Sequence, residues 1–207
     1  MKKIFVFMFW IAALLAGCKT EEEVKESAQS FNYVVDHFAD VEIMRYQVDN
    51  WDSLSLNQKK LVYYLSEAAL CGRDIIFDQN CAYNILIKNA LEAIVDTYSG
   101  DKSTQDWEKF MEYVKRFWFS NGIHHHYSYA KFYPEISKEY FVSLMNGSDK
   151  NKIFAGDQLQ QKIVMDLIAN VIFDTTKVSL KVSQDPNADL VQSSAVNFYR
   201  NVTQQEV

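Results

Sequence analysis

The chain has 207 residues with a formal net charge of −6, and 48% of its residues are apolar. This length and apolar content are sufficient for one buried core. An acidic composition lacks the basic surface that proteins use to bind nucleic acid, so we expect no nucleic-acid partner.

The first residues are typical of a bacterial secretion signal. Two lysines precede an uninterrupted apolar run, Ile4 to Leu15, which is shorter than a comfortable membrane span. The next residues, Leu15-Ala16-Gly17-Cys18, match the lipobox at which cleavage leaves a lipidated cysteine at the new N-terminus. We therefore predict a lipoprotein signal peptide over residues 1–17 and lipidation of Cys18. The alternative is an ordinary secretion signal followed by a chance cysteine.

Residues 18–30 are polar and show no apolar periodicity, which favours a flexible tether. The mature protein is then expected in the bacterial cell envelope, on its periplasmic or surface side. The lipid on Cys18 would be its contact with the membrane, which the chain would not span.

The pattern of residues 31–207 predicts a mainly α-helical fold with one or two short strands. Ser55 and Gln58 form a capping-box pair before a helix over Leu56–Leu70, and Gly72 suits the end of that helix. Further helices are predicted over about 81–98, from a cap at Ser103 or Thr104 to Asn121-Gly122, from Ser137 to Met145, from Asp157 to about Ile172, and over Asp189–Tyr199. Short strands are predicted within 41–48 and over 177–183.

Four of the predicted helices carry an apolar face at helical spacing, and we expect these faces to be buried. They comprise Leu61, Val62, Leu65, Ala68 and Ala69; Ile87, Leu91, Ile94, Val95 and Tyr98; Trp107, Phe110, Met111, Val114, Phe117 and Trp118; and Leu159, Ile163, Leu167, Ile168 and Ile172. Residues 73–80, between the first two helices, are expected to form a connector.

No catalytic signature is present in the sequence. The chain has no G-x-S-x-G, no H-E-x-x-H and no glycine-rich phosphate loop. Arg73, Asp74 and Asp78 could form a polar site, although such charges more often form a local ion pair at the surface. Cys71 and Cys81 could pair after export or remain free, and the sequence leaves both alternatives open.

Three of the four histidines stand together directly after a predicted helix end, in the stretch Asn121–Tyr127. Binding groups concentrate in loops that a rigid scaffold holds. In an extended segment, His124 and His126 would point to the same side and could face one ion. A zinc site needs three or four ligands and His37 is the only other histidine, so we predict no metal site within this chain. The candidate binding residues are Asn121, His124, His126 and Tyr127, and a solvated surface loop is the alternative.

Four segments of the chain resemble the N-terminal region of bacterial dipeptidyl peptidase III in its Bacteroides-type form. They are Leu61–Ile75 (LVYYLSEAALCGRDI), Asp78-Gln79-Asn80, Trp118–Tyr127 (WFSNGIHHHY) and Lys131–Pro134 (KFYP). The resemblance extends over essentially all of residues 31–207. Relative to the eukaryotic members, this chain keeps Ser120-Asn121, Lys131-Phe132 and Pro134 and replaces the middle of the loop with the histidine run.

This resemblance implies a zinc exopeptidase that removes dipeptides from the N-terminus of short peptides, with two lobes around a wide cleft. The zinc ligands of the family lie far downstream of the region matched here. The chain would then be the N-terminal part of one lobe, would hold no cofactor itself, and would depend on a C-terminal catalytic lobe that holds the zinc. In the family the loop that matches Asn121–Tyr127 lies toward the cleft, which implies contact of its residues with peptide or with the opposite lobe.

Thr203 and Glu206 stand at capping-box spacing next to the last residue, which favours a helix that continues beyond Val207. We therefore expect residues 31–207 to be incomplete at the C-terminus. A frayed end with a chance pattern is the alternative. Two other functions remain open: an envelope lipoprotein that binds peptides or a partner without catalysis, and a lipoprotein that captures metal through His124 and His126.

Overall fold

The computed structural model describes residues 31–153 and 158–207. The predicted signal peptide, the lipidation site at Cys18, the tether and the predicted cap at Asp157 lie outside these residues. The described part is mainly helical and contains one two-stranded antiparallel sheet, which confirms the predicted fold class. Its elements are β1 (Val34–Phe38), β2 (Val41–Met44), the 3-10 helix η1 (Trp51–Ser53), α2 (Leu56–Cys71), α3 (Arg73–Asn80), α4 (Asn84–Thr97), α5 (Gln105–Ser120), α6 (Lys138–Asn146), α7 (Lys150–Ile153), α8 (Gln158–Phe173) and α9 (Leu190–Ser193).

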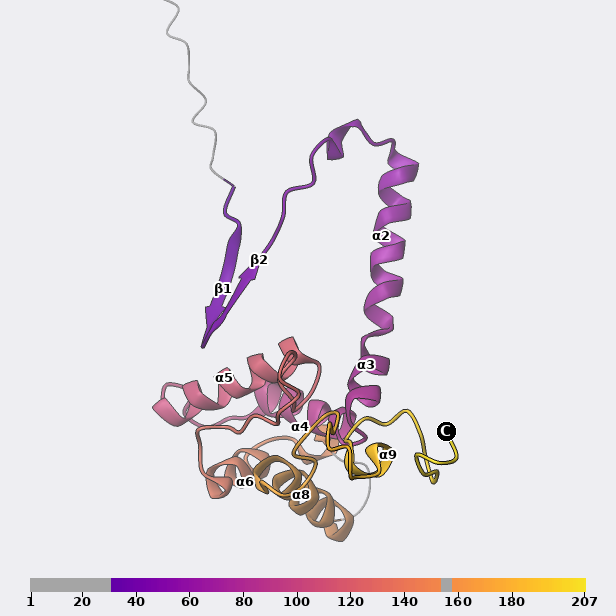
Figure 1. Ribbon diagram of the computed structural model, residues 1–207. Coiled ribbons are helices and arrows are strands. Elements are labelled where there is room, and N and C mark those ends of the chain that lie inside the picture. The colour runs from indigo at the N-terminus through magenta and orange to yellow at the C-terminus, as the bar shows by residue number, and fades with distance from the viewer. Residues whose placement is uncertain (1–30, 154–157) are drawn as a thin grey trace, which may run out of the picture.

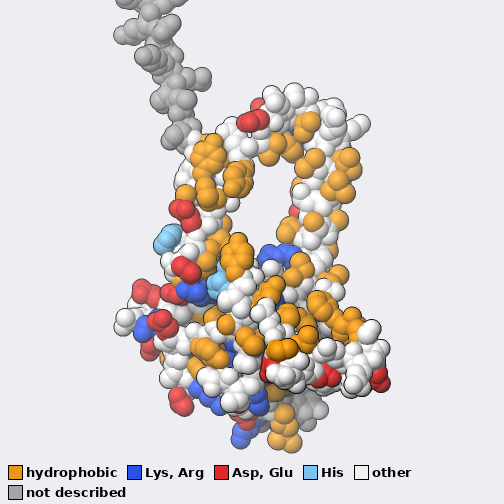
Figure 2. All heavy atoms as spheres, viewed as in Figure 1, with side chains coloured by type: hydrophobic (Ala, Val, Ile, Leu, Met, Phe, Trp, Pro, Cys, Tyr) orange, Lys and Arg blue, Asp and Glu red, His pale blue; other side chains and the backbone are white. Residues whose placement is uncertain are grey.

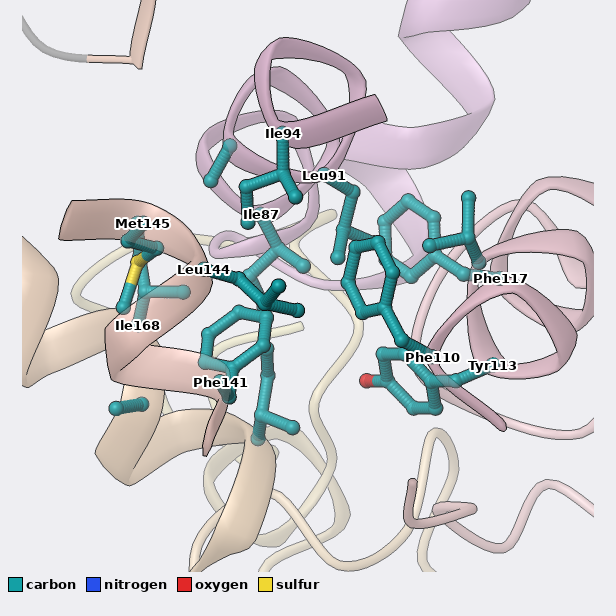
Figure 3. Close-up of a cluster of buried hydrophobic side chains, with 14 of the residues drawn as sticks. Ile87, Leu91, Ile94, Phe110, Tyr113, Phe117, Phe141, Leu144, Met145 and Ile168 are labelled. Carbon is teal, nitrogen blue, oxygen red and sulfur yellow. The ribbon is translucent and has the colours of Figure 1, made fainter. Parts of the chain in front are cut away.

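A helical body forms the lower part of the molecule, built from α4, α5, α6 and α8 (Figure 1). Side chains from these helices point toward one another and form a single cluster of buried apolar residues (Figure 3). Helix α5 contributes Phe110, Val114 and Phe117, which are fully buried. Burial of large apolar side chains of this kind contributes about 2 kcal/mol each. The predicted apolar face of this helix is thus confirmed as the wall of the core.

The predicted face of α8 is only half correct. Ile168 and Ile172 are buried, whereas Leu159 and Ile163 are 67% and 59% exposed. The buried side of α8 also includes Met165 and Ala169. At about 100° per residue, Ile163 lies about 140° and Leu159 about 180° around the helix from Ile168. The predicted stripe therefore crosses two sides of α8, and its first half faces away from the core.

Above the body, the hairpin β1–β2 and the helix α2 rise side by side and are joined at the top through η1 (Figure 1). We call these elements, residues 33–71, the arch. The space-filling view shows an opening between its two arms, with hydrophobic and histidine side chains at the lower edge (Figure 2). The arch is therefore attached to the body at both ends and is open to solvent between them.

Helix α2 makes the clearest departure from the sequence prediction. None of its 16 residues is buried. Leu61, Val62 and Leu65, which were expected to face a core, are all exposed, as are Tyr63 and Tyr64 on other sides of the helix. Over residues 61–65 the helix is apolar on every side, and a helical segment of this kind is normally enclosed by protein. In the described residues nothing encloses this one.

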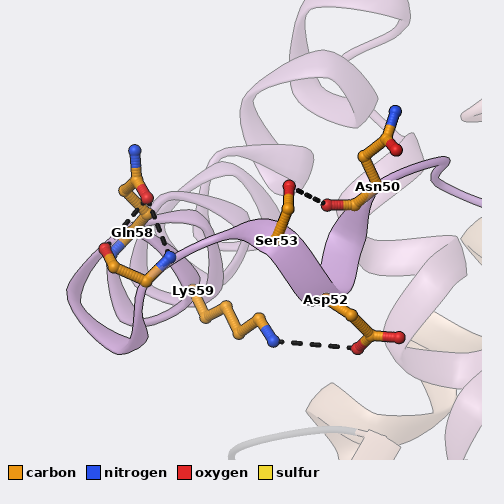
Figure 4. Close-up of polar contacts among 6 residues, drawn as sticks. Asn50, Asp52, Ser53, Gln58 and Lys59 are labelled. Atoms are coloured by element: carbon orange, nitrogen blue, oxygen red, sulfur yellow. Dashed lines mark hydrogen bonds and ion pairs between the residues drawn. The ribbon is translucent and has the colours of Figure 1, made fainter.

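Local polar contacts explain why the top of the arch keeps its shape (Figure 4). The Ser55 side chain accepts a hydrogen bond from the Gln58 backbone, and the Gln58 side chain accepts one from the Ser55 backbone, which confirms the predicted capping box. The Ser53 hydroxyl donates to the Asn50 carbonyl at 2.7 Å, and Lys59 lies 3.8 Å from Asp52. These contacts define the first turn of α2 without any tertiary partner.

The lower end of the hairpin is fixed to α5. Lys115 Nζ lies 2.7 Å from Asp36 Oδ2, and its hydrogen bond and charge hold the pKa of Asp36 below the usual range. Arg116 pairs with Asp40 at 3.0 Å on the other side of the turn. Exposed ion pairs contribute little free energy individually, so we assign them the role of orienting the hairpin.

Other expectations were wrong or incomplete. Residues 73–80 form the helix α3 and not a connector, and residues 177–183 form an isolated bridge to Ala130 and no strand. The predicted helix over 189–199 is reduced to α9. Cys71 is exposed, Cys81 is buried, and both are free thiols. Over residues 31–153 and 158–207, no helix has the length and apolar character to cross a bilayer.

Candidate functional site

The candidate site begins at the C-terminal end of α5. Asn121 adopts the left-handed conformation, with φ 53° and ψ 47°, and its N–H donates back into the last turn of α5. Gly122 follows with φ +139°, and its N–H donates to the Phe117 carbonyl at 3.0 Å. This pair turns the chain sharply out of the helix, as the predicted Asn-Gly stop requires. We call the segment that follows, residues 123–131, the histidine loop.

Asn84 ties the start of the histidine loop to the neighbouring helices. Its side chain is fully buried, donates to the Phe77 carbonyl at 3.0 Å and accepts from the Ile123 N–H at 3.3 Å. Asn80 adds a side-chain bond to the Asn121 carbonyl at 3.0 Å. Buried backbone groups need such partners, because an unsatisfied one costs about 1–3 kcal/mol. The start of the loop is therefore fixed.

His124 points into the protein. It is 2% exposed, and its Nε2 lies 2.7 Å from the Val178 carbonyl. A carbonyl only accepts, so Nε2 carries the hydrogen and Nδ1 is left as a bare acceptor. That Nδ1 is buried and has no hydrogen-bond partner. Burial lowers the pKa of His124 to about 4. The residue is thus neutral near pH 7 and fastens the loop to the segment after α8.

His125, His126 and Tyr127 form an aromatic stack at the surface. The His126 ring lies 4.5 Å from His125 and 4.4 Å from Tyr127, measured between ring centroids. Phe119, on the last turn of α5, places its ring edge-on at 4.9 Å from His126. Tyr127 is 82% exposed. Burial and the neighbouring His125 both lower the pKa of His126, which favours an uncharged stack.

Lys131 closes the histidine loop from beneath. It is 6% exposed, and its Nζ donates to the backbone carbonyls of Val171, Asp174 and Lys177 at 2.7, 2.6 and 3.0 Å. The last carbonyls of a helix have no partner within the helix. An ammonium placed there satisfies the end of α8 and complements its dipole. Lys131 therefore joins the loop to α8 through its charge.

The hairpin, α5 and the histidine loop converge beside the stack. A cavity of about 10 Å³ lies between Asp40, Arg116, Phe119 and His126. This is close to the smallest space that holds one water molecule. The lower end of the arch and the stack are consequently packed against each other, and the stack lies where the arch meets the body.

The four candidate residues have different positions. His126 and Tyr127 are adjacent at the surface, and Asn121 is half-buried at the end of α5. His124 is interior, so its ring serves the loop structure and does not reach the surface with His126. The sequence interpretation missed Phe119 and Asn84, which support the loop. The Asn84 position carried no pattern that marked it, whereas Phe119 was visible as an extra aromatic beside a complete helix face.

Within residues 31–153 and 158–207, no three His, Cys, Asp or Glu side chains are grouped so that they could hold a metal ion. The only ring nitrogen of His124 that carries a hydrogen is already bonded to a carbonyl.

Comparison of the chain with models of known protein families and with curated protein sequences gave no match.

The position of His124 predicts a pH dependence of stability. Its pKa is 6.5 normally and about 4 in the folded chain. Between pH 6.5 and about 4, the unfolded chain therefore binds a proton at His124 but the folded chain does not. The free energy of unfolding falls as the pH falls through this range. Relative to pH 7.5, we expect a loss of about 2 kcal/mol at pH 5 from this residue. Urea unfolding at both pH values should show that His124→Gln reduces the difference by this amount.

His37 provides the control, because it is exposed on β1. His37→Gln should leave the difference between the two pH values unchanged. An unaltered pH dependence in His124→Gln would contradict the assignment of a buried, neutral imidazole.

Proposed function

We propose that this chain is the N-terminal segment of a zinc-dependent dipeptidyl peptidase, in which polypeptide outside these residues supplies the metal site. The reaction would release dipeptides from the N-termini of short peptides. The sequence resemblance described above motivates this proposal. The observation that carries it is the arch, whose apolar helix has no partner in the described chain.

The arch supports the proposal because its exposed surface is too apolar for a stable, isolated element. Exposed large apolar residues occur on the hairpin, on η1 and on every side of α2. Monomeric soluble proteins rarely leave contiguous apolar patches of this extent uncovered. A second lobe packed against α2 would remove this surface from water. The body, with its own core, would then be one part of a larger enzyme.

The histidine loop gives this segment its proposed role toward the substrate. His126 contacts Tyr127 and lies beside Phe119 and Asp40 at the foot of the arch, where a covering lobe would meet the body. The Tyr127 hydroxyl and the exposed ring faces could hold an extended peptide by one hydrogen bond and by stacking. Hydrolysis would use a zinc-activated water held by the other lobe. The residues of this chain would bind and orient the peptide.

The product of the complete reading frame is the protein with which to test this proposal. It should release dipeptides from a pentapeptide in a zinc-dependent reaction. Tyr127→Ala should raise KM about tenfold with little change in kcat, since the contact is made with the bound peptide and not only in the transition state. The control is Tyr199→Phe, because Tyr199 is exposed and lies outside the histidine loop. This variant should change neither KM nor kcat. A reading frame that encodes no zinc-binding motif would refute the enzyme assignment.

The 207-residue chain by itself is expected to be inactive. It lacks a grouped set of metal ligands among its described residues, and the proposed chemistry requires a metal-activated water. Incubation of the purified chain with a pentapeptide, with and without added zinc, should release no dipeptide by mass spectrometry. Zinc-dependent release by this chain alone would overturn the proposal.

A second candidate function is an envelope lipoprotein that binds peptides or a partner without catalysis. The fully packed core and the internally fixed histidine loop favour it, because both form without further polypeptide. The same reading-frame test separates the two functions. Peptide binding without dipeptide release, in the complete product, would favour the second.

A further inference from the structure

A second recess lies on the body, away from the histidine loop, where the end of α2 meets α3, α4 and α5. Its volume is about 510 Å³. This falls within the range of about 300–1,000 Å³ that is typical of small-molecule sites. Its principal lining residues are Phe77, Trp118, Arg73, Asp74, Lys88 and Glu92. We call this recess the α3 pocket.

The floor of the α3 pocket is apolar and rigid. Phe77 is 1% exposed and stacks on Phe117 of the core, with 5.4 Å between ring centroids. Trp118 adds a second aromatic ring from α5. Aromatic surfaces of this size favour an apolar or aromatic group of a ligand.

One side of the pocket rim carries a net negative charge. Lys88 lies 2.9 Å from Asp74 and 3.6 Å from Glu92. Burial works to lower the pKa of Lys88, but the hydrogen bond and charge of Asp74, together with Glu92, outweigh it and raise this pKa. The ammonium is thus retained, and two carboxylates against one ammonium leave one negative charge. A ligand ammonium would be attracted to this side.

The lining of the pocket also includes N–H donors that have no acceptor among the described residues. Arg73 is exposed at the first position of α3, and none of the described residues accepts a hydrogen bond from its guanidinium or forms an ion pair with it. Trp118 Nε1 is buried without a hydrogen-bond partner. A buried N–H without an acceptor is costly, but this atom has almost no accessible surface, so the donor within reach of a ligand is Arg73. A carboxylate would satisfy Arg73 by two parallel hydrogen bonds.

We propose that the α3 pocket binds the zwitterion of a short apolar peptide, a dipeptide in size. The carboxylate binds Arg73, the ammonium binds Asp74 and Glu92, and the apolar side chains lie on Leu70 and Trp118. Two extended residues span about 7 Å, which lets the two charged ends contact different residues of one recess. A single amino acid would leave much of the volume unfilled. The site consists of residues of this chain alone and does not depend on the proposed peptidase activity.

Isothermal titration calorimetry of the purified 207-residue chain with three forms of one dipeptide tests this site. The forms are Leu-Phe, N-acetyl-Leu-Phe and Leu-Phe amide. We expect saturable binding of Leu-Phe and at least about tenfold weaker binding of each blocked form, because the amide loses the paired hydrogen bonds to Arg73 and the acetyl form loses the contact of its ammonium with Asp74 and Glu92. Equal affinity for all three forms, or no saturable binding of Leu-Phe, would overturn the proposal.

The protein variants locate the charges. Arg73→Gln should weaken Leu-Phe about tenfold but leave the affinity for Leu-Phe amide unchanged, because the partner of Arg73 is already absent from the amide. The control is Arg200→Gln, because Arg200 is exposed and does not line the pocket. This variant should bind Leu-Phe with the affinity of the unchanged chain. Trp118→Phe keeps an aromatic ring at this position but removes the indole, and it should abolish the ligand-induced change in tryptophan fluorescence. A fluorescence change that persists in Trp118→Phe, or Leu-Phe affinity unaffected by Arg73→Gln, would refute the site.

Discussion

Replacement of Lys131 by methionine is expected to lower the free energy of unfolding by about 3 kcal/mol. The methionine fills nearly the same space but donates no hydrogen bond. The carbonyls of Val171, Asp174 and Lys177 would then lose the donor that they share at the end of α8. The site is buried, so water could replace the lost ammonium only after the loop moves. Urea unfolding followed by far-ultraviolet circular dichroism measures the change.

Lys177→Met is the matched control for this experiment. Lys177 belongs to the same segment, but its side chain is exposed and only its backbone carbonyl takes part in the contact. We expect a change within about 0.5 kcal/mol for this control. Equal stability of Lys131→Met and Lys177→Met would show that the three carbonyl bonds do not contribute to folding.

The Lys131 contact also explains why the histidine loop has one conformation. The His124 imidazole and the Lys131 ammonium lie on facing residues of one antiparallel bridge, and both bind carbonyls of the segment from α8 to Val178. Two anchors on one side leave the opposite side, with His126 and Tyr127, free at the surface. The stack is therefore held from behind by groups that do not themselves meet a ligand.

Helices α5 and α6 of the body were predictable because their ends and, in α5, the apolar face carry local information. Thr104 and Ser137 cap α5 and α6 through their side chains, as their positions in the sequence suggested. The apolar period of α5 gave its buried face directly, because the helix is flanked by the core on one side only. The hydrogen bonds at the helix ends and the apolar periodicity are enough to predict such helices, so the elements that pack against them need not be known.

The arch was not predictable in the same way. Apolar residues at helical spacing in α2 indicate a helix, and the helix is present, but the pattern does not say which polypeptide covers it. Leu61 and Leu65 were assigned to a core of this chain and instead remain exposed. Burial depends on what packs against a helix as well as on its own sequence, and none of the described residues buries α2.

The loop after α5 was predictable in position, but the orientations of its side chains were not. The helix stop at Asn121-Gly122 indicated this loop, and alternation suggested that His124 and His126 share a side. In the structure His124 turns inward to the Val178 carbonyl, which lies 54 residues away in sequence. A contact of such separation leaves no local pattern. The two histidines therefore act in different ways, one for structure and one at the surface.

Gly122→Ala is expected to lower the free energy of unfolding by about 4 kcal/mol. Gly122 has φ +139°, which other residues avoid, and an added Cβ would overlap the buried side-chain amide of Asn84. Asn84 cannot move without loss of its bonds to Phe77 and Ile123. The strain and the overlap add together at the start of the histidine loop. Thermal and urea unfolding should both report the loss.

Two further variants separate the causes. Gly72→Ala is the matched control, because Gly72 has φ −81° and an added Cβ would lie 3.5 Å from the nearest atom, the Ala69 carbonyl oxygen. We expect this control to be neutral or slightly stabilising. In the double variant Asn84→Ala/Gly122→Ala the overlap is absent but the backbone strain remains. The double variant should therefore lose about 1–2 kcal/mol less free energy of unfolding than the sum of the losses in the two single variants. Strict additivity would mean that Asn84 does not restrict Gly122, and an unaffected Gly122→Ala would mean that the turn after α5 is not the one described.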